Sequence, residues 1–107
     1  MPREVRLTIP HNLGEEEATH RIRDGLERLR IDYGTYLSTA HAAWNENRAD
    51  VEIGAFGQSI TGTIDVAPDV VNIVIVLPLL LASLAERARH FLESKGADML
   101  RLPPQPS

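Results

Sequence analysis

The four histidines are the side chains of this sequence best suited to metal binding or proton transfer. They stand far apart in the chain, and no two of them are four residues apart: His11, His20, His41 and His90. A metal site needs three or four convergent ligands, and this spacing indicates no such set. We expect His20 and His90 to be solvated residues on the polar sides of helices, and we keep His11, in the first loop, as a candidate for another role.

Carboxylate pairs are the second candidate for chemistry. Asp65 and Asp69 flank a Val-Ala-Pro turn, and Asp50 and Glu52 lie on the outward face of an expected strand. General acid–base catalysis needs a carboxylate whose pKa is shifted by burial or by a like charge, and a solvated turn supplies neither. The chain also lacks a G-x-S-x-G elbow and a phosphate-binding glycine loop. We therefore expect a protein that is not an enzyme and that uses no cofactor or metal ion.

Two apolar features indicate binding rather than catalysis. Trp44 could stack on a ligand, although a single Trp at the end of a strand favours packing at the rim of a core. The run Leu77-Pro78-Leu79-Leu80-Leu81 holds more apolar side chains than one helix face can bury. This run could line a hydrophobic cavity, form an oligomer contact or dock on lipid or polymer, but deep burial at one end of the fold is the favoured interpretation.

The first half of the chain is expected to form a strand followed by a helix. Apolar and polar residues alternate over 3–9, which is the period of a half-buried strand. Apolar residues then recur at steps of four and three, which predicts an amphipathic helix with Asn12 as its cap and Gly34 at its end. Three glutamates in its first turn suit the positive end of the helix dipole.

The second half of the chain is expected to form four strands and a last helix. The alternation predicts strands over 36–44, 50–55, 60–66 and 70–77, joined by short turns. Pro78 opens the last helix and Gly96 ends it. Its apolar stripe consists of Leu80, Leu84, Ala88, Phe91 and Leu92.

This order, β-α-β-β-β-β-α, predicts an α+β two-layer sandwich, an antiparallel sheet with two helices on one face. We expect a single domain over 1–100 and a flexible Pro-rich tail over 101–107. In the last strand Val74 and Val76 are apolar on the face away from the helices. Either a second copy of the chain covers them in a homodimer, or two exposed valines are tolerated.

Composition excludes several classes of protein. The 107 residues include no cysteine, and 11 Lys and Arg against 15 Asp and Glu give a net charge of −4. This acidity argues against a nucleic-acid partner, which would need a basic face. The longest apolar stretch is interrupted by Asn72 and Pro78, and is too short for a transmembrane segment. The first residues lack the apolar core of a signal peptide, so we expect a cytoplasmic protein.

A set of segments resembles the polyhydroxyalkanoic acid system family. The segment FGQSITGTIDV at 56–66 is followed by a strand and by LPLLLA at 77–82, which opens the last helix. The first strand ends in PHNLG at 10–14, and Trp44 precedes an acidic strand. The family consists of short bacterial proteins whose genes are associated with polyhydroxyalkanoate granule systems. It has no established catalytic residues, so the resemblance implies a cytoplasmic, granule-associated protein and transfers no catalytic site.

We therefore expect a non-enzymatic protein that contacts the granule surface, a granule protein or a second copy of itself. The candidate surface is apolar and lies either at the run that includes Leu77, Leu79, Leu80 and Leu81 or at the strand face with Val74 and Val76. The alternative is a binder of a small hydrophobic acyl ligand between the sheet and the C-terminal helix, by analogy with larger helix-grip folds. An enzyme acting on hydroxyacyl thioesters is the least favoured hypothesis, since no site supports it.

Overall fold

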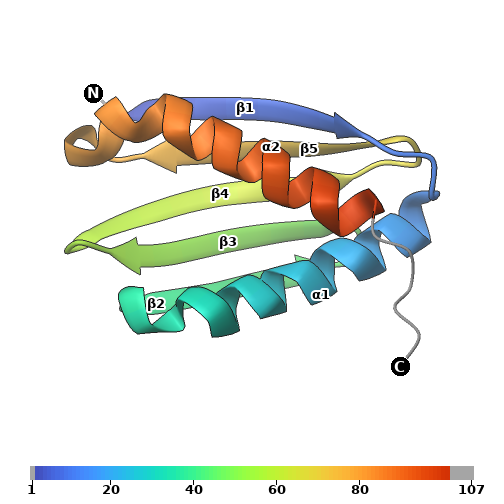
Figure 1. The fold of residues 1–107 in the computed structure, drawn as a ribbon, viewed down its shortest axis with the longest axis horizontal. Coiled ribbons are helices and arrows are strands. Elements are labelled where there is room, and N and C mark those ends of the chain that lie inside the picture. The colour runs from blue at the N-terminus through green and yellow to red at the C-terminus, as the bar shows by residue number, and fades with distance from the viewer. Residues whose placement is uncertain (1, 102–107) are drawn as a thin grey trace.

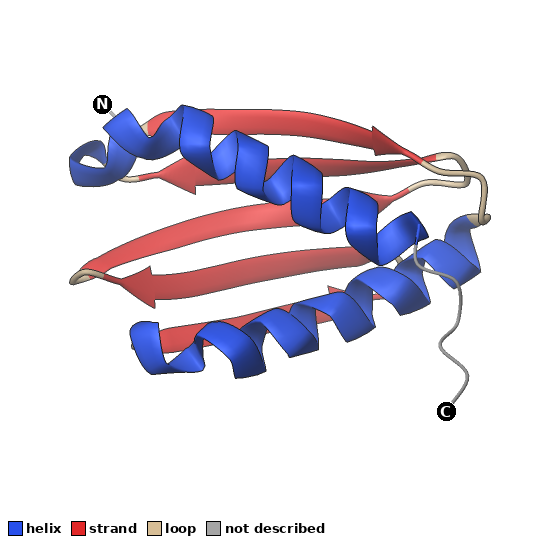
Figure 2. Cartoon of the chain, viewed as in Figure 1, coloured by secondary structure: helices blue, strands red, loops and turns tan. Residues whose placement is uncertain are grey.

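The computed structural model describes residues 2–101, which fold into one five-stranded sheet with both helices on the same face (Figure 1; Figure 2). This confirms the α+β sandwich and its element order. The elements are β1 (Arg3–Pro10), α1 (Glu15–Tyr33), the 3₁₀ helix η1 (Gly34–Tyr36), β2 (Thr39–Asn45), β3 (Arg48–Ala55), β4 (Gln58–Val66), β5 (Val70–Leu77), the 3₁₀ helix η2 (Leu79–Leu84) and α2 (Ala85–Arg101). The tail expected over 101–107 lies outside the described residues, apart from Arg101 at the end of α2.

The sheet has the order β1-β5-β4-β3-β2, and every neighbouring pair of strands is antiparallel. Strands β2 to β5 form a meander joined by short turns, because each turn leaves no room for a crossover. β1 pairs with β5 from Arg3 opposite Leu77 to Pro10 opposite Val70. The strand predicted over 36–44 begins only at Thr39, because residues 34–36 continue α1 as a 3₁₀ turn.

α1 begins at a glycine instead of at the predicted cap. Gly14 is the N-cap residue, with a φ of 82°, and no side chain caps the helix. This left-handed conformation, which glycine adopts at low cost, turns the chain from β1 into the helix and leaves Asn12 outside it. The three glutamates occupy the first turn as expected, and the helix ends at Tyr33 beside Gly34.

The last helix differs from its prediction at both ends. Pro78 stays extended, and residues Leu79–Leu84 form the 3₁₀ helix η2 before α2 begins. A 3₁₀ helix has three residues per turn, so it shifts the phase of the side chains and leaves Leu80 exposed. Gly96 does not end the helix. It is buried within α2, where a Cβ would lie 2.3 Å from Cδ1 of Ile9, so glycine allows α2 to approach β1 closely.

The core lies between the helices and the β1, β5 and β4 side of the sheet. Its buried side chains alternate along β1 and β5 and meet Ala18 and Ile22 from α1, and Leu81, Ala85 and Leu100 from η2 and α2. β2 contributes no buried residue, so the side chains are less closely packed near this strand. Among the described residues, no helix is long and apolar enough to cross a membrane.

Candidate functional site

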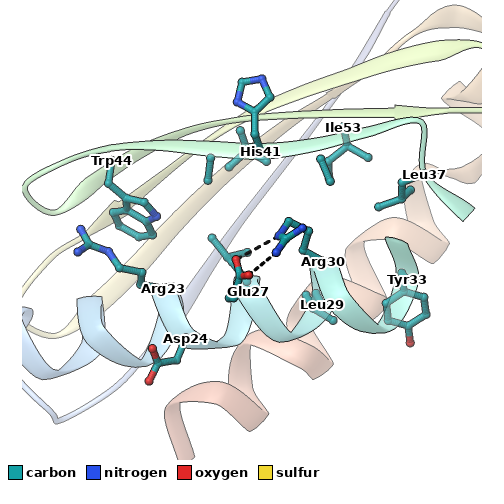
Figure 3. Close-up of a pocket in the computed structure, with 14 residues that line it drawn as sticks. Arg23, Asp24, Glu27, Leu29, Arg30, Tyr33, Leu37, His41, Trp44 and Ile53 are labelled. Carbon is teal, nitrogen blue, oxygen red and sulfur yellow. Dashed lines mark hydrogen bonds and ion pairs between the residues drawn. The ribbon is translucent and has the colours of Figure 1, made fainter. Parts of the chain in front are cut away.

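A cleft of about 680 Å³ lies between α1 and the strands β2 and β3 (Figure 3). The first half of α1 packs on the sheet through Ala18 and Ile22, whereas Leu26 and Leu29 in the second half are only half-buried. The facing positions on β2 are the small residues Ala40 and Ala42, which leave space that larger side chains would fill. The apolar lining consists of Leu26, Leu29, Tyr33, Leu37, Ala40, Ala42, Trp44, Val51 and Ile53.

Four charged side chains of α1 line this cleft: Arg23, Asp24, Glu27 and Arg30. Arg30 donates hydrogen bonds to both carboxylate oxygens of Glu27, one of them at 3.2 Å from Nε to Oε2. These bonds hold the pKa of Glu27 below its ordinary value and raise the pKa of Arg30. Within 2–101, Arg23 forms no ion pair, and its guanidinium lies 4.9 Å from the centre of the Trp44 ring. Of the two arginines in the cleft, Arg30 is therefore paired with a carboxylate, whereas Arg23 has no carboxylate partner among the described residues.

The remaining polar neighbours point away from the cleft. Figure 3 shows Asp24 directed to the far side of α1 and His41 directed to the outer face of the sheet. Asp24 lies 3.3 Å from Nε2 of His20, and His41 lies 3.3 Å from Glu52 on the neighbouring strand. His20 and His41 are therefore surface residues, each paired with a nearby carboxylate.

A second surface feature is an apolar end of the molecule, where α1 ends, β3 turns into β4 and β5 leads into η2 (Figure 1). All of the large apolar side chains that are exposed in the described chain belong to these segments or touch them. Phe91 of α2 joins them through an edge-on contact with Tyr33, at 5.9 Å between ring centres. The apolar end consists of Ile31, Tyr33, Tyr36, Phe56, Leu79, Leu80, Leu84 and Phe91.

The structure separates the six residues of the predicted apolar surface. Leu77 and Leu81 are buried in the core. Leu79 and Leu80 are 65% and 73% exposed and belong to the apolar end. Val74 and Val76 lie on the opposite face of the sheet, half-buried and paired with Thr63 and Thr61 on β4. The six residues therefore do not form one surface.

His11 joins two loops of the fold. Its Nε2 lies 3.0 Å from the carbonyl oxygen of Ala67, and its Nδ1 accepts a hydrogen bond from the backbone N–H of Leu13 at 3.2 Å. These partners assign the proton to Nε2. The imidazole thus links the loop before α1 to the turn between β4 and β5, which is a structural role.

The other candidates are placed as follows. Trp44 packs against the core, as expected for a Trp at the rim of a core. It also lines the cleft, where it could contact a ligand. Asp65 lies 3.8 Å from Arg48 on the adjacent strand. No group of three or more His, Asp or Glu residues in the described part of the chain could hold a metal ion.

This cleft was not predicted from the sequence. The cleft also lies beneath α1, whereas the ligand-binding alternative placed a ligand under the C-terminal helix. That helix, α2, packs directly on β1 through Gly96 and Ile9. The one available signal was the pair of alanines, Ala40 and Ala42, on the inward face of a strand.

The architecture is shared with a protein of known structure. The di-domain ARO/CYC protein BexL from the BE-7585A biosynthetic pathway superposes with a TM-score of 0.56 at 10% sequence identity. The match covers 96% of this chain and 51% of BexL, so this chain spans about half of that protein. At this identity the likeness shows the fold alone. Among curated proteins, none matches the sequence.

The family follows from the sequence itself. The model of the family described as "putative polyhydroxyalkanoic acid system protein" matches residues 5–100. The chain therefore belongs to this family, which confirms the resemblance seen in its motifs. The match extends from β1 to α2 and includes both the cleft and the apolar end.

Proposed function

We propose that this protein is a cytoplasmic, non-enzymatic component of the polyhydroxyalkanoic acid system that docks on the polyester granule through its apolar end. The observation that carries this proposal is that the large apolar side chains exposed in residues 2–101 belong to segments that lie at one end of the molecule, or contact them. Single apolar residues on a surface are ordinary, but a group of them indicates an interaction site. Membership of the family supplies the partner, since a polyester surface is uncharged and largely apolar.

The geometry of η2 supports docking because it exposes two leucines on a segment that is anchored in the core. Leu77 and Leu81 are buried on either side of them and anchor the segment in the core. Leu81 also donates a backbone hydrogen bond of 2.9 Å to the carbonyl of Pro78. Leu79 and Leu80 therefore need little reordering to meet a surface, which keeps the entropic cost of binding low.

Phe56 gives independent support. It occupies the turn between β3 and β4 with a φ of 55°, followed by Gly57 with a φ of 73°. A bulky residue in this left-handed region is strained, and the turn favours Asn or Gly at both positions. The side chain is 84% exposed, so burial within the chain does not offset this strain. Contact with a partner would explain an aromatic residue at this position.

Docking on a granule requires several apolar side chains, because their burial must offset the free-energy cost of association. Burying a large apolar side chain contributes about 1.5–3 kcal/mol, while association costs about 4–15 kcal/mol in lost freedom of motion. Leu79, Leu80, Phe56 and Tyr36, the most exposed of the group, could together offset much of this cost. The proposal therefore predicts moderate affinity that depends on several residues.

Co-sedimentation with protein-stripped polyhydroxybutyrate granules tests the proposal. We expect saturable binding of the natural chain and at least about tenfold weaker binding of the Leu79→Ser, Leu80→Ser double variant. The matched control is Val74→Thr with Val76→Thr on the opposite face of the sheet, which should bind normally. Circular dichroism and light scattering confirm that each variant is folded and report its oligomeric state.

The outcomes separate the partners that the sequence left open. Equal binding of the leucine variant and the natural chain would refute docking through η2. Binding only to granules that retain their proteins would assign the partner as a granule protein. If the natural chain is a dimer that does not bind granules, and the valine variant is a monomer, the result would refute granule docking and favour a homodimer through the outer face of the sheet.

A further inference from the structure

The cleft beneath α1 has the size and shape of a small-molecule site. Its volume of about 680 Å³ falls within the range of roughly 300–1,000 Å³ that is typical of ligand pockets. It follows α1 from Arg23 to Tyr33, and ten residues of α-helix span about 15 Å. An elongated ligand lying along the helix would therefore fit better than a round one.

The walls of the cleft suit an unbranched hydrocarbon chain. Leu26 and Leu29 approach from the helix, while Val51 and Ile53 form the sheet side, and all four are half-buried. The backbone groups between β2 and β3 are paired with each other in the sheet. A hydrocarbon chain could cover these side chains without leaving a polar group unsatisfied.

One cation gives the cleft a polar end. Arg30 is paired with Glu27, and the Asp24 carboxylate points to the other side of α1, where it lies 3.3 Å from Nε2 of His20, so neither residue pairs with Arg23. Arg23 stacks on Trp44 without a carboxylate partner in the described chain. Stacking uses the face of the guanidinium and leaves its N–H edges available for the two oxygens of a carboxylate.

We propose that the cleft between α1 and the strands β2 and β3 binds a medium-chain carboxylic acid. Its carboxylate contacts Arg23 beside Trp44, and its chain lies on the apolar side chains between α1 and the sheet. Charge complementarity at Arg23 selects an acid over a neutral molecule of the same length. This site goes beyond granule docking: it shares Tyr33 with the apolar end, but Leu79 and Leu80 are not among its lining residues.

Trp44 supplies the measurement, since it is the single Trp of the chain and lines the cleft. Decanoate, titrated below its micelle concentration, should change the Trp fluorescence saturably, and decan-1-ol should bind at least about tenfold more weakly. Calorimetry repeats both titrations, because variants near Trp44 alter its emission directly. The Leu79→Ser, Leu80→Ser variant should bind decanoate normally, which separates this site from the apolar end.

Three variants make the test decisive. Arg23→Gln should lower decanoate affinity about tenfold or more and leave decan-1-ol affinity unchanged. Arg28→Gln, an exposed arginine of the same helix outside the cleft, is the matched control and should have no effect. Ala42→Leu should fill the cleft and abolish binding, while thermal unfolding shows that the protein remains folded.

The proposal is overturned if folded protein shows no saturable binding of decanoate. It is also overturned if Arg23→Gln and Arg28→Gln lower the affinity equally, because the carboxylate would then lack a specific partner. Unchanged decanoate binding by a folded Ala42→Leu variant would place the ligand elsewhere and have the same consequence.

Discussion

Replacing Phe56 by Asn should change stability and granule binding in opposite directions. Phe56 has a φ of 55° in a two-residue turn that ends at Gly57. Holding an L-residue in the left-handed region costs about 1–2 kcal/mol, and Asn tolerates this region better because its short polar side chain bonds locally. Asn followed by Gly is the preferred sequence of this turn. The variant should therefore be more stable by about 0.5–1 kcal/mol.

The expected loss of binding follows from the exposure of the same side chain. At 84% exposed, Phe56 loses almost no intramolecular packing when it is replaced. Its burial against a granule would contribute about 1.5–3 kcal/mol, so binding should weaken roughly 10- to 100-fold. A more stable variant that binds less well cannot be explained by unfolding.

Urea denaturation and granule co-sedimentation measure the two effects on the same samples. The matched control is Glu46→Asn, since Glu46 also has a positive φ, of 58°, but lies in the β2–β3 turn at the opposite end of the molecule. This control should gain similar stability and bind granules normally. Docking through the apolar end is refuted if Phe56→Asn binds as well as the natural chain. The account of the strained turn is refuted if both variants lose stability.

Two further predictions concern the helices. Gly96→Ala should destabilise the protein by about 1 kcal/mol. The new Cβ would lie 2.3 Å from Cδ1 of Ile9, and the free-energy cost of this overpacking should exceed the gain from the higher helix propensity of alanine. Combining it with Ile9→Val, which removes Cδ1, should restore near-natural stability in urea denaturation, and simple additivity of the two changes would contradict the contact. Carbon NMR titration of Glu27 should show a pKa below the ordinary value of a glutamate, and this pKa should rise toward the ordinary value in Arg30→Gln. The Glu27–Arg30 pair thus favours the folded state above the ordinary carboxyl pKa and loses this effect as the pH falls through the lowered value, so an unchanged pKa in Arg30→Gln would exclude the pair as its cause.

The fold was predictable from the sequence because most of its elements have a clear period. Residues 70–77 alternate with buried members from Val71 to Leu77, and the strand has the predicted bounds. The bounds of helices were less predictable, because a glycine can either end a helix or allow close packing within one. Gly96 reads as a helix end in sequence, and only its proximity to Ile9, from the other end of the chain, shows that it allows close packing.

The candidate site was less predictable because it depends on tertiary geometry. The cleft opens where the second half of α1 faces the small residues Ala40 and Ala42 of β2, and no local period in the sequence shows that these segments face each other. The sequence placed Phe56 in a turn and Tyr36 in a strand. Neither residue by itself indicated a binding surface. Only the strand order places the β3–β4 turn beside the end of α1 and the start of η2.

The position of β1 has a consequence for solubility. β1 is a terminal strand of the sheet, and its outward side chains, Glu4, Arg6 and Thr8, are polar or charged. The neighbouring β5 is almost entirely aliphatic, and without β1 its backbone N–H and C=O groups would be open to pairing with another chain. Charged side chains on an outermost strand oppose such pairing. The first strand therefore shields the most aggregation-prone segment of the protein, and a chain whose β1 detaches would expose β5 as a template for intermolecular sheets.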